Sequence, residues 1–138
     1  MPSYHLTLDP DLAEIPRLLD WVEACCGAAG VSGDFAGKLA LTLEEAAANV
    51  INHAFADSPP PYHLAVILTI DADRVAAEII DNGKAFDPTA IPEPDCTLPL
   101  DSRDPGGLGI QLIRKMVDRV DYRRVGGENH LHLEKARN

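Results

Sequence analysis

Two apolar segments joined by a tight turn limit the folds open to this chain most strongly. Residues 62–70 (YHLAVILTI) and 74–81 (RVAAEIID) are rich in aliphatic and β-branched residues, and only residues 71–73 separate them. So short a connection joins antiparallel strands, because a parallel pair needs a crossover of a dozen or more residues. The sequence therefore predicts an antiparallel hairpin.

Periodicity and turn residues predict the other elements. Alternation indicates a strand over 3–8, and Gly126–Gly127 separate two short strands further along. Helical spacing predicts three helices, with Pro16 in the first turn of one and Asp34 as the N-cap of the next. The expected order is strand 3–8, helices 16–29 and 34–55, strands 62–70 and 74–81, helix 108–117, and strands 120–125 and 129–134. This order predicts an α+β fold, a two-layer sandwich with helices on one face of a mixed, mostly antiparallel sheet.

Length and composition indicate one domain over residues 1–138. Hydrophobic residues make up 46% and charged residues 25%, as in ordinary globular domains. The net charge of −10 disfavours direct nucleic-acid binding, because phosphate backbones are bound by basic surfaces. This charge suits a basic protein partner, or solubility alone, which is the simpler interpretation. With no apolar run of membrane-spanning length and no signal-peptide pattern, we expect a cytoplasmic protein without membrane contact.

A proline-rich segment and a glycine cluster precede the third predicted helix. Residues 87–105 hold five prolines and show no periodicity, so a long and often functional kind of loop is expected. Gly106, Gly107 and Gly109 follow it. Such glycines form a tight turn, or they let the N–H groups of a helix N-terminus bind an anion. From these residues alone the tight turn is the better interpretation, because a short glycine cluster is a weak motif.

Polar side chains share one face of the second predicted helix. They are spaced by three or four residues: Thr42, Glu45, Asn49 and His53. The apolar stripe beside them consists of Leu39, Leu43, Ala46, Val50 and Ala54. A solvated face is the ordinary interpretation, but Asn and His are poorer helix formers than exposed Lys or Gln. The face is therefore a candidate site.

Two other polar features also have an ordinary structural interpretation. Asp81 and Gly83 fit a turn after the second hairpin strand, although a carboxylate at a strand end also suits a ligand's amino group. His130 and His132 share one strand face, which exposed polar alternation explains better than a metal site.

Three sequence blocks occur together in a fixed order, namely EEAAANVINHAF (44–55), DNGKAFDP (81–88) and GGLGIQLI (106–113). This combination resembles the GHKL superfamily of ATP-binding domains, which includes histidine kinases and type II topoisomerases. The short chain and the second and third blocks are most similar to the anti-sigma-factor serine/threonine kinases. The resemblance extends from about residue 5 to residue 135 and implies a Bergerat-type ATP-binding fold.

The first block implies residues that bind ATP and Mg²⁺. By this resemblance Asn49 is the metal ligand, and Glu45, one helical turn earlier, is the catalytic carboxylate. The chemistry is suitable, because Mg²⁺ prefers oxygen ligands and a carboxylate can accept the proton of an attacking hydroxyl. Asn52 and His53 match positions that contact the sugar or phosphates of the nucleotide.

The other two blocks imply contacts to the base and the phosphates. Asp81 matches an aspartate that recognises the adenine amino group, and Gly83 a glycine that lets the base approach. Residues 87–105 match the nucleotide lid, in which Arg103 reaches a phosphate or is an ordinary exposed arginine. The segment implied to lie against the phosphates consists of Gly106, Gly107, Leu108 and Gly109.

The resemblance leaves two functions open. The first is an anti-sigma regulatory factor that uses ATP to phosphorylate a serine or threonine of a small antagonist protein, and that also sequesters a sigma factor. The second is a non-catalytic module that binds its protein partner in a nucleotide-dependent way. Glu45 discriminates between them, because a pure binder does not need a catalytic carboxylate. Relatives often pair, so a homodimer is compatible with both.

Overall fold

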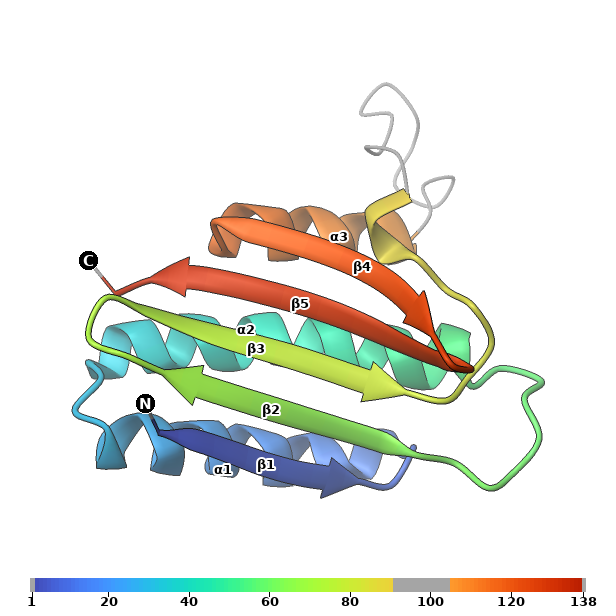
Figure 1. Ribbon diagram of the computed structural model, residues 1–138, viewed down its shortest axis with the longest axis horizontal. Helices are drawn as coiled ribbons and strands as arrows, with labels where there is room; N and C mark the ends of the chain where they lie inside the picture. The colour runs from blue at the N-terminus through green and yellow to red at the C-terminus, as the bar shows by residue number, and fades with distance from the viewer. Residues whose placement is uncertain (1, 91–104, 138) are drawn as a thin grey trace.

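The computed structural model describes residues 2–90 and 105–137, with the backbone alone for residues 105–109. Its main elements are β1 (Ser3–Leu8), α1 (Ile15–Ala28), α2 (Gly33–Asn49), β2 (Leu64–Ile70), β3 (Arg74–Asp81), α3 (Pro105–Met116), β4 (Arg119–Val125) and β5 (Glu128–Ala136) (Figure 1). Short helical segments occur at η1 (Leu12–Glu14), η2 (Val50–Ala54) and η3 (Pro88–Ala90). The order predicted from the sequence is confirmed.

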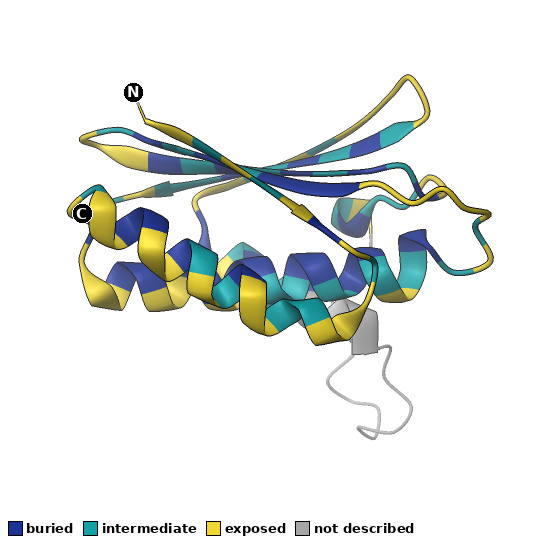
Figure 2. Cartoon of the chain, turned by 90° about the horizontal axis from the view of Figure 1, so that it is seen from below, coloured by how far each residue is buried: buried dark blue, intermediate teal, exposed yellow. Residues whose placement is uncertain are grey.

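The strands form one sheet in the order β1-β2-β3-β5-β4. Each neighbouring pair is antiparallel, so the described sheet is not mixed. Two of the pairs are hairpins with very short turns, and the turn between β4 and β5 uses Gly126 and Gly127, both at positive φ. Figure 2 shows the helices on one face of the sheet, which confirms the predicted two-layer α+β fold.

The core lies between this face and the helices. Alternate residues of the central strands point into it, among them Val66 and Leu68 of β2 and Ile79 of β3, all 1% exposed or less. The predicted apolar stripe of the second helix is buried from Leu39 to Ala54. Within the described ranges, no helix has both the length and the apolar character that a membrane span requires.

Two predicted helix starts are wrong. Helix α2 is capped by Ser32, whose Oγ accepts a hydrogen bond from the Phe35 amide at 3.2 Å. Asp34 instead lies in the first turn, where the helix dipole favours its charge, and it pairs with Lys38 at 3.3 Å. Helix α3 begins at Pro105 rather than at residue 108, so the glycine cluster lies within the helix, at its N-terminal end. Proline is common at the first position of a helix, because an N–H group at that position has no partner within the helix and its absence costs nothing.

Helix α2 ends in a π-turn, η2, that brings the chain back towards the sheet. The Phe55 amide bonds to the Val50 carbonyl, and the Ala54 carbonyl accepts a hydrogen bond from the Lys84 amide at 2.8 Å. Single π-turns of this kind are frequent at functional sites. This one joins the end of α2 to the residues that follow β3.

Candidate functional site

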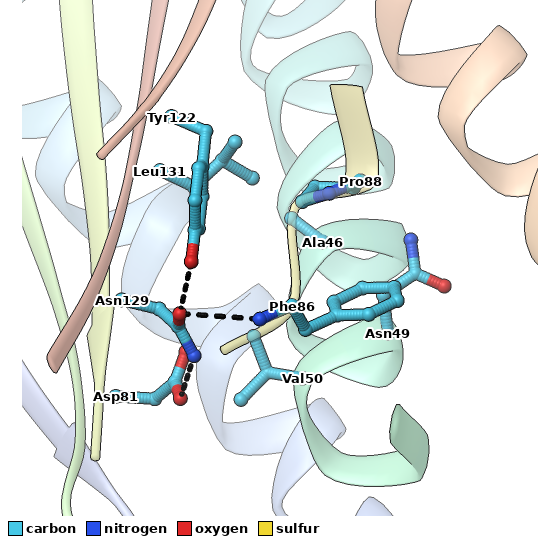
Figure 3. A pocket seen from close by; sticks show the side chains of 9 residues that line it. All are labelled: Ala46, Asn49, Val50, Asp81, Phe86, Pro88, Tyr122, Asn129 and Leu131. Atoms are coloured by element: carbon cyan, nitrogen blue, oxygen red, sulfur yellow. Dashed lines mark hydrogen bonds between the residues drawn. The ribbon is translucent and has the colours of Figure 1, made fainter. Parts of the chain in front are cut away.

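A small pocket lies between α2 and the adjoining ends of β3 and β5 (Figure 3). Its lining consists of Ala46, Asn49, Val50, Asp81, Phe86, Pro88, Tyr122, Asn129 and Leu131. The cavity holds about 10 Å³, room for about one water molecule, because aromatic and apolar side chains fill most of the space. Two residues predicted from separate sequence blocks, Asn49 and Asp81, therefore line the same pocket.

Asp81 is the last residue of β3 and is 2% exposed. Its Oδ1 accepts hydrogen bonds from the Gly83 amide and from Asn129 Nδ2, both at 2.9 Å. Burial raises the pKa of this carboxyl, while those two hydrogen bonds and the charge of Arg124 oppose the rise. Within the described residues its Oδ2 accepts no hydrogen bond, so one oxygen remains for a ligand donor.

Asn129 connects Asp81 to the segment that follows β3. Its Nδ2 also donates to the Lys84 carbonyl at 2.8 Å, and its Oδ1 accepts from the Phe86 amide at 3.3 Å and from the Tyr122 hydroxyl. Figure 3 shows the contacts with Asp81, Phe86 and Tyr122. A side chain of β5 thus fixes both the carboxylate and the backbone of residues 84–86.

The missing side chain of Gly83 lets the backbone of η2 pack closely against this position. A Cβ at this position would lie 2.4 Å from the carbonyl oxygen of Ala54, which is closer than real Cβ atoms approach. The family resemblance implies that the missing side chain admits a base. In the structure it admits the backbone of the π-turn, which carries the end of α2 close to Asp81.

Asn49 and Glu45 lie one turn apart on α2 but differ in their surroundings. Asn49 lines the pocket, is 8% exposed, and its Nδ2 is buried without a hydrogen-bond partner in the described structure. Figure 3 shows its amide directed away from Asp81. Glu45 is half-buried and has no hydrogen bond or ion pair with the described residues. A polar ligand would supply partners to both.

These residues fit a Mg²⁺ ion that is held mainly by its substrate. Asn49 Oδ1 accepts no hydrogen bond from a described residue, so this oxygen can bind a cation, whereas the buried Nδ2 needs an acceptor such as a phosphate oxygen. The part of the chain that the structure describes has no group of three or more His, Cys, Asp or Glu residues able to enclose a metal. Mg²⁺ commonly binds in this way, through one or two protein oxygens, phosphates and water.

The remaining predicted residues lie around the pocket or outside the described structure. His53 stacks on Phe86, with ring centroids 5.1 Å apart, whereas Asn52 is exposed. Gly106 and Gly107 lie in the first turn of α3, where N–H groups have no intrahelical partner, and Leu108 and Gly109 follow them directly. Arg103 and most of the predicted lid, residues 91–104, lie outside the described residues.

His130 and His132 lie on the opposite face of the sheet from the pocket. The prediction that both are exposed is wrong, because both are partly buried, and the His130 side chain, near Glu128 and Glu78, is only 14% exposed. His132 contacts Glu134 at 3.1 Å. Cross-strand neighbours cover His130, because β5 lies between β3 and β4 in the sheet.

Sequence reasoning missed Asn129, Tyr122 and Phe86. A signal for Asn129 was present, because it falls in register with Leu131 and Leu133 on the buried face of β5. A polar residue in an apolar alternation is worth noting, since a buried amide must be hydrogen-bonded. Phe86 and Tyr122 gave no such signal.

Comparison with known proteins finds similarity to two serine or serine/threonine protein kinases. It is 39% identical over 97 residues to the serine/threonine-protein kinase BtrW of Bordetella bronchiseptica, covering 69% of this chain and 66% of that protein. It is 26% identical to the serine-protein kinase RsbW of Halalkalibacterium halodurans, covering 71% of this chain and 61% of that protein. The matches thus span slightly less than two thirds of these curated relatives.

Solved structures share the fold. The RsbU and RsbW domains of a Mycobacterium tuberculosis protein superpose with a TM-score of 0.67 at 14% identity, covering 98% of this chain and 32% of that one. The histidine kinase domain of a blue-light activated protein from Erythrobacter litoralis gives 0.53 at 17% identity, covering 90% and 59%. The family described as histidine kinase-like ATPase domain matches residues 8–135. The chain belongs to this family.

Proposed function

We propose that the chain is an anti-sigma regulatory factor that binds ATP and Mg²⁺ and acts as a serine/threonine protein kinase on a small antagonist protein. One observation carries the proposal. Asp81, a buried carboxylate with one oxygen available, lies in the same pocket as Asn49, whose amide has unmet hydrogen bonding. The names of BtrW and RsbW, both serine kinases, support the reaction class.

In this proposal one end of the site binds the base of ATP, and the other end binds the phosphates and carries out phosphoryl transfer. Asp81 accepts a hydrogen bond from the adenine amino group, and the first turn of α3 presents its N–H groups to phosphate oxygens. Asn49 would hold Mg²⁺, which would neutralise charge on the phosphates. The hydroxyl oxygen of the substrate serine or threonine attacks the γ-phosphorus, Glu45 accepts the hydroxyl proton, and ADP leaves.

The proposed partners are the antagonist, a sigma factor and a second copy of the chain, in the cytoplasm. The second candidate function is a non-catalytic module that binds a sigma factor in a nucleotide-dependent way. It is favoured by the position of Glu45, which does not line the pocket in the described structure.

A transfer assay separates the two functions. The chain is incubated with ATP labelled at the γ-phosphate and with the antagonist encoded nearest to its gene, and label on serine or threonine is measured. The kinase proposal expects labelled antagonist and release of ADP in equal amounts. Tight ATP binding without transfer to any candidate acceptor would contradict it and support the binding module.

A further inference from the structure

Asn129 occupies a core position that an apolar side chain would ordinarily fill. It is 3% exposed, and its neighbours on the same face of β5 are Leu131 and Leu133. A buried amide there is retained only if its hydrogen bonds are made, since an unpaired one is costly. The partners of Asn129 are therefore informative about its purpose.

The orientation of the Asn129 amide is set by its neighbours. Its Oδ1 faces three donors: the Tyr122 hydroxyl, the Phe86 amide at 3.3 Å and Arg124 Nη1 at 3.1 Å. Its Nδ2 faces two acceptors, Asp81 Oδ1 and the Lys84 carbonyl. A flipped amide would direct oxygen at a carboxylate and nitrogen at donors, so the observed orientation is the one that satisfies every group.

We propose that Asn129 is a positioning residue that sets the base selectivity of the site. By donating to Asp81 Oδ1 together with the Gly83 amide, it leaves only Oδ2 for the base and holds that oxygen in one direction. A fixed acceptor selects a base with an exocyclic amino group and rejects one with a carbonyl oxygen there. The inference rests on the proposed function, because it takes Asp81 as the residue that meets the base.

The same amide couples base recognition to the chain that follows β3. Lys84 and Phe86 both bond to Asn129, and the Phe86 ring stacks on His53 of η2. Arg124 supports the arrangement through a 2.7 Å hydrogen bond to the Gly83 carbonyl. Loss of Asn129 therefore frees both the carboxylate and residues 84–86.

The test compares ATP with inosine triphosphate, which carries a carbonyl oxygen in place of the adenine amino group. Affinities are measured by calorimetry for the unmodified chain and for Asn129→Ala. We expect the unmodified chain to prefer ATP. In Asn129→Ala we expect ATP affinity to fall roughly tenfold, the size of one hydrogen bond to a charged group, with inosine triphosphate little affected.

Asn129→Asp keeps the shape of the side chain and adds a pH-dependent readout. At pH 8 two adjacent carboxylates have no hydrogen between them, and the preference for ATP falls. As the pH is lowered to 5.5, the pair takes up a proton in a growing fraction of molecules, residue 129 again donates to Asp81, and the preference moves back towards that of the unmodified chain at the same pH. The other titratable or charged groups near this position are Tyr122 and Arg124 on β4 and Glu128 on β5.

His132→Ala is the matched control, because His132 lies on the same strand but on the outer face of the sheet. If Asn129→Ala does not fold, Asn129→Asp carries the test. Equal losses of affinity for both nucleotides, or an unchanged preference in both variants, would overturn the inference while leaving the kinase proposal intact. An unmodified chain that binds neither nucleotide, or binds both equally, would overturn the assignment of Asp81 and this inference with it.

Discussion

The two ends of the candidate site are built differently. At the proposed base end, Asp81, Gly83 and Asn129 are buried, and both the Gly83 amide and Asn129 donate hydrogen bonds to Asp81. At the proposed phosphate end, Asn49 Nδ2 has no partner and Glu45 makes no polar contact within the described structure. Selectivity for a base needs acceptors fixed in advance, whereas groups that meet phosphate and metal gain their partners from the ligand. The sheet supplies the first kind of group, and the helix α2 the second.

The largest expected effect lies at the phosphate end. Glu45→Ala should slow phosphoryl transfer by about 10²–10⁴-fold, the usual contribution of a general base, and leave ATP affinity nearly intact. Single-turnover transfer and calorimetry on the same preparation measure the two quantities. Asn49→Ala is the contrasting variant, because it should weaken Mg²⁺-dependent ATP binding itself. Transfer at the parent rate in Glu45→Ala would make that carboxylate structural.

A substitution at the proposed base end should change the affinity for ATP. Asp81→Asn keeps the side-chain volume but removes the carboxylate acceptor, so ATP binding should weaken by about 1.5–3 kcal/mol, or roughly 10- to 150-fold. Calorimetric titration with ATP checks this value. The affinity for inosine triphosphate should change less, since its carbonyl oxygen makes no hydrogen bond with a carboxylate. Unchanged ATP affinity would remove Asp81 from the site.

Gly83 tests whether the base end depends on close packing. Gly83→Ala places a Cβ 2.4 Å from the Ala54 carbonyl oxygen, so we expect destabilisation of about 1–3 kcal/mol from the forced backbone shift. Thermal and urea unfolding measure it. Gly37→Ala is the control, because its Cβ meets nothing within 4 Å and alanine favours a helix by about 0.5–1 kcal/mol. Similar unfolding curves for both variants would contradict the packing argument.

The smallest effect is a pH dependence of stability. Burial raises the pKa of Asp81, so the folded state binds its proton more tightly than the unfolded state. Stability is then fully present below the ordinary carboxyl pKa of about 3.9 and falls as pH rises through the raised value. Asp81→Asn should therefore be more stable than the parent at pH 7, with the difference shrinking towards pH 4. Urea unfolding at both values measures it, and a constant difference would point to another cause.

Part of the site was readable from separate stretches of sequence. Helical spacing predicted that Glu45 and Asn49 share one face of a helix. Asp81 was a candidate because it ends an apolar strand and lies close to a glycine. The resemblance implied that Asn49 and Asp81, which come from different blocks, belong to one site, and in the structure both line one pocket.

The sequence by itself determined the elements, their order and the antiparallel hairpins, because periodicity and turn residues act over a few positions. It did not determine the helix starts, since Ser32 and Asp34 are both good caps and only the path of the chain decides between them. It did not reveal what Gly83 packs against, nor that Asn129 holds Asp81 across the sheet. Those contacts join residues 29 and 48 positions apart, so only the tertiary structure, by pairing β3 with β5 and packing η2 against the residues after β3, could decide them.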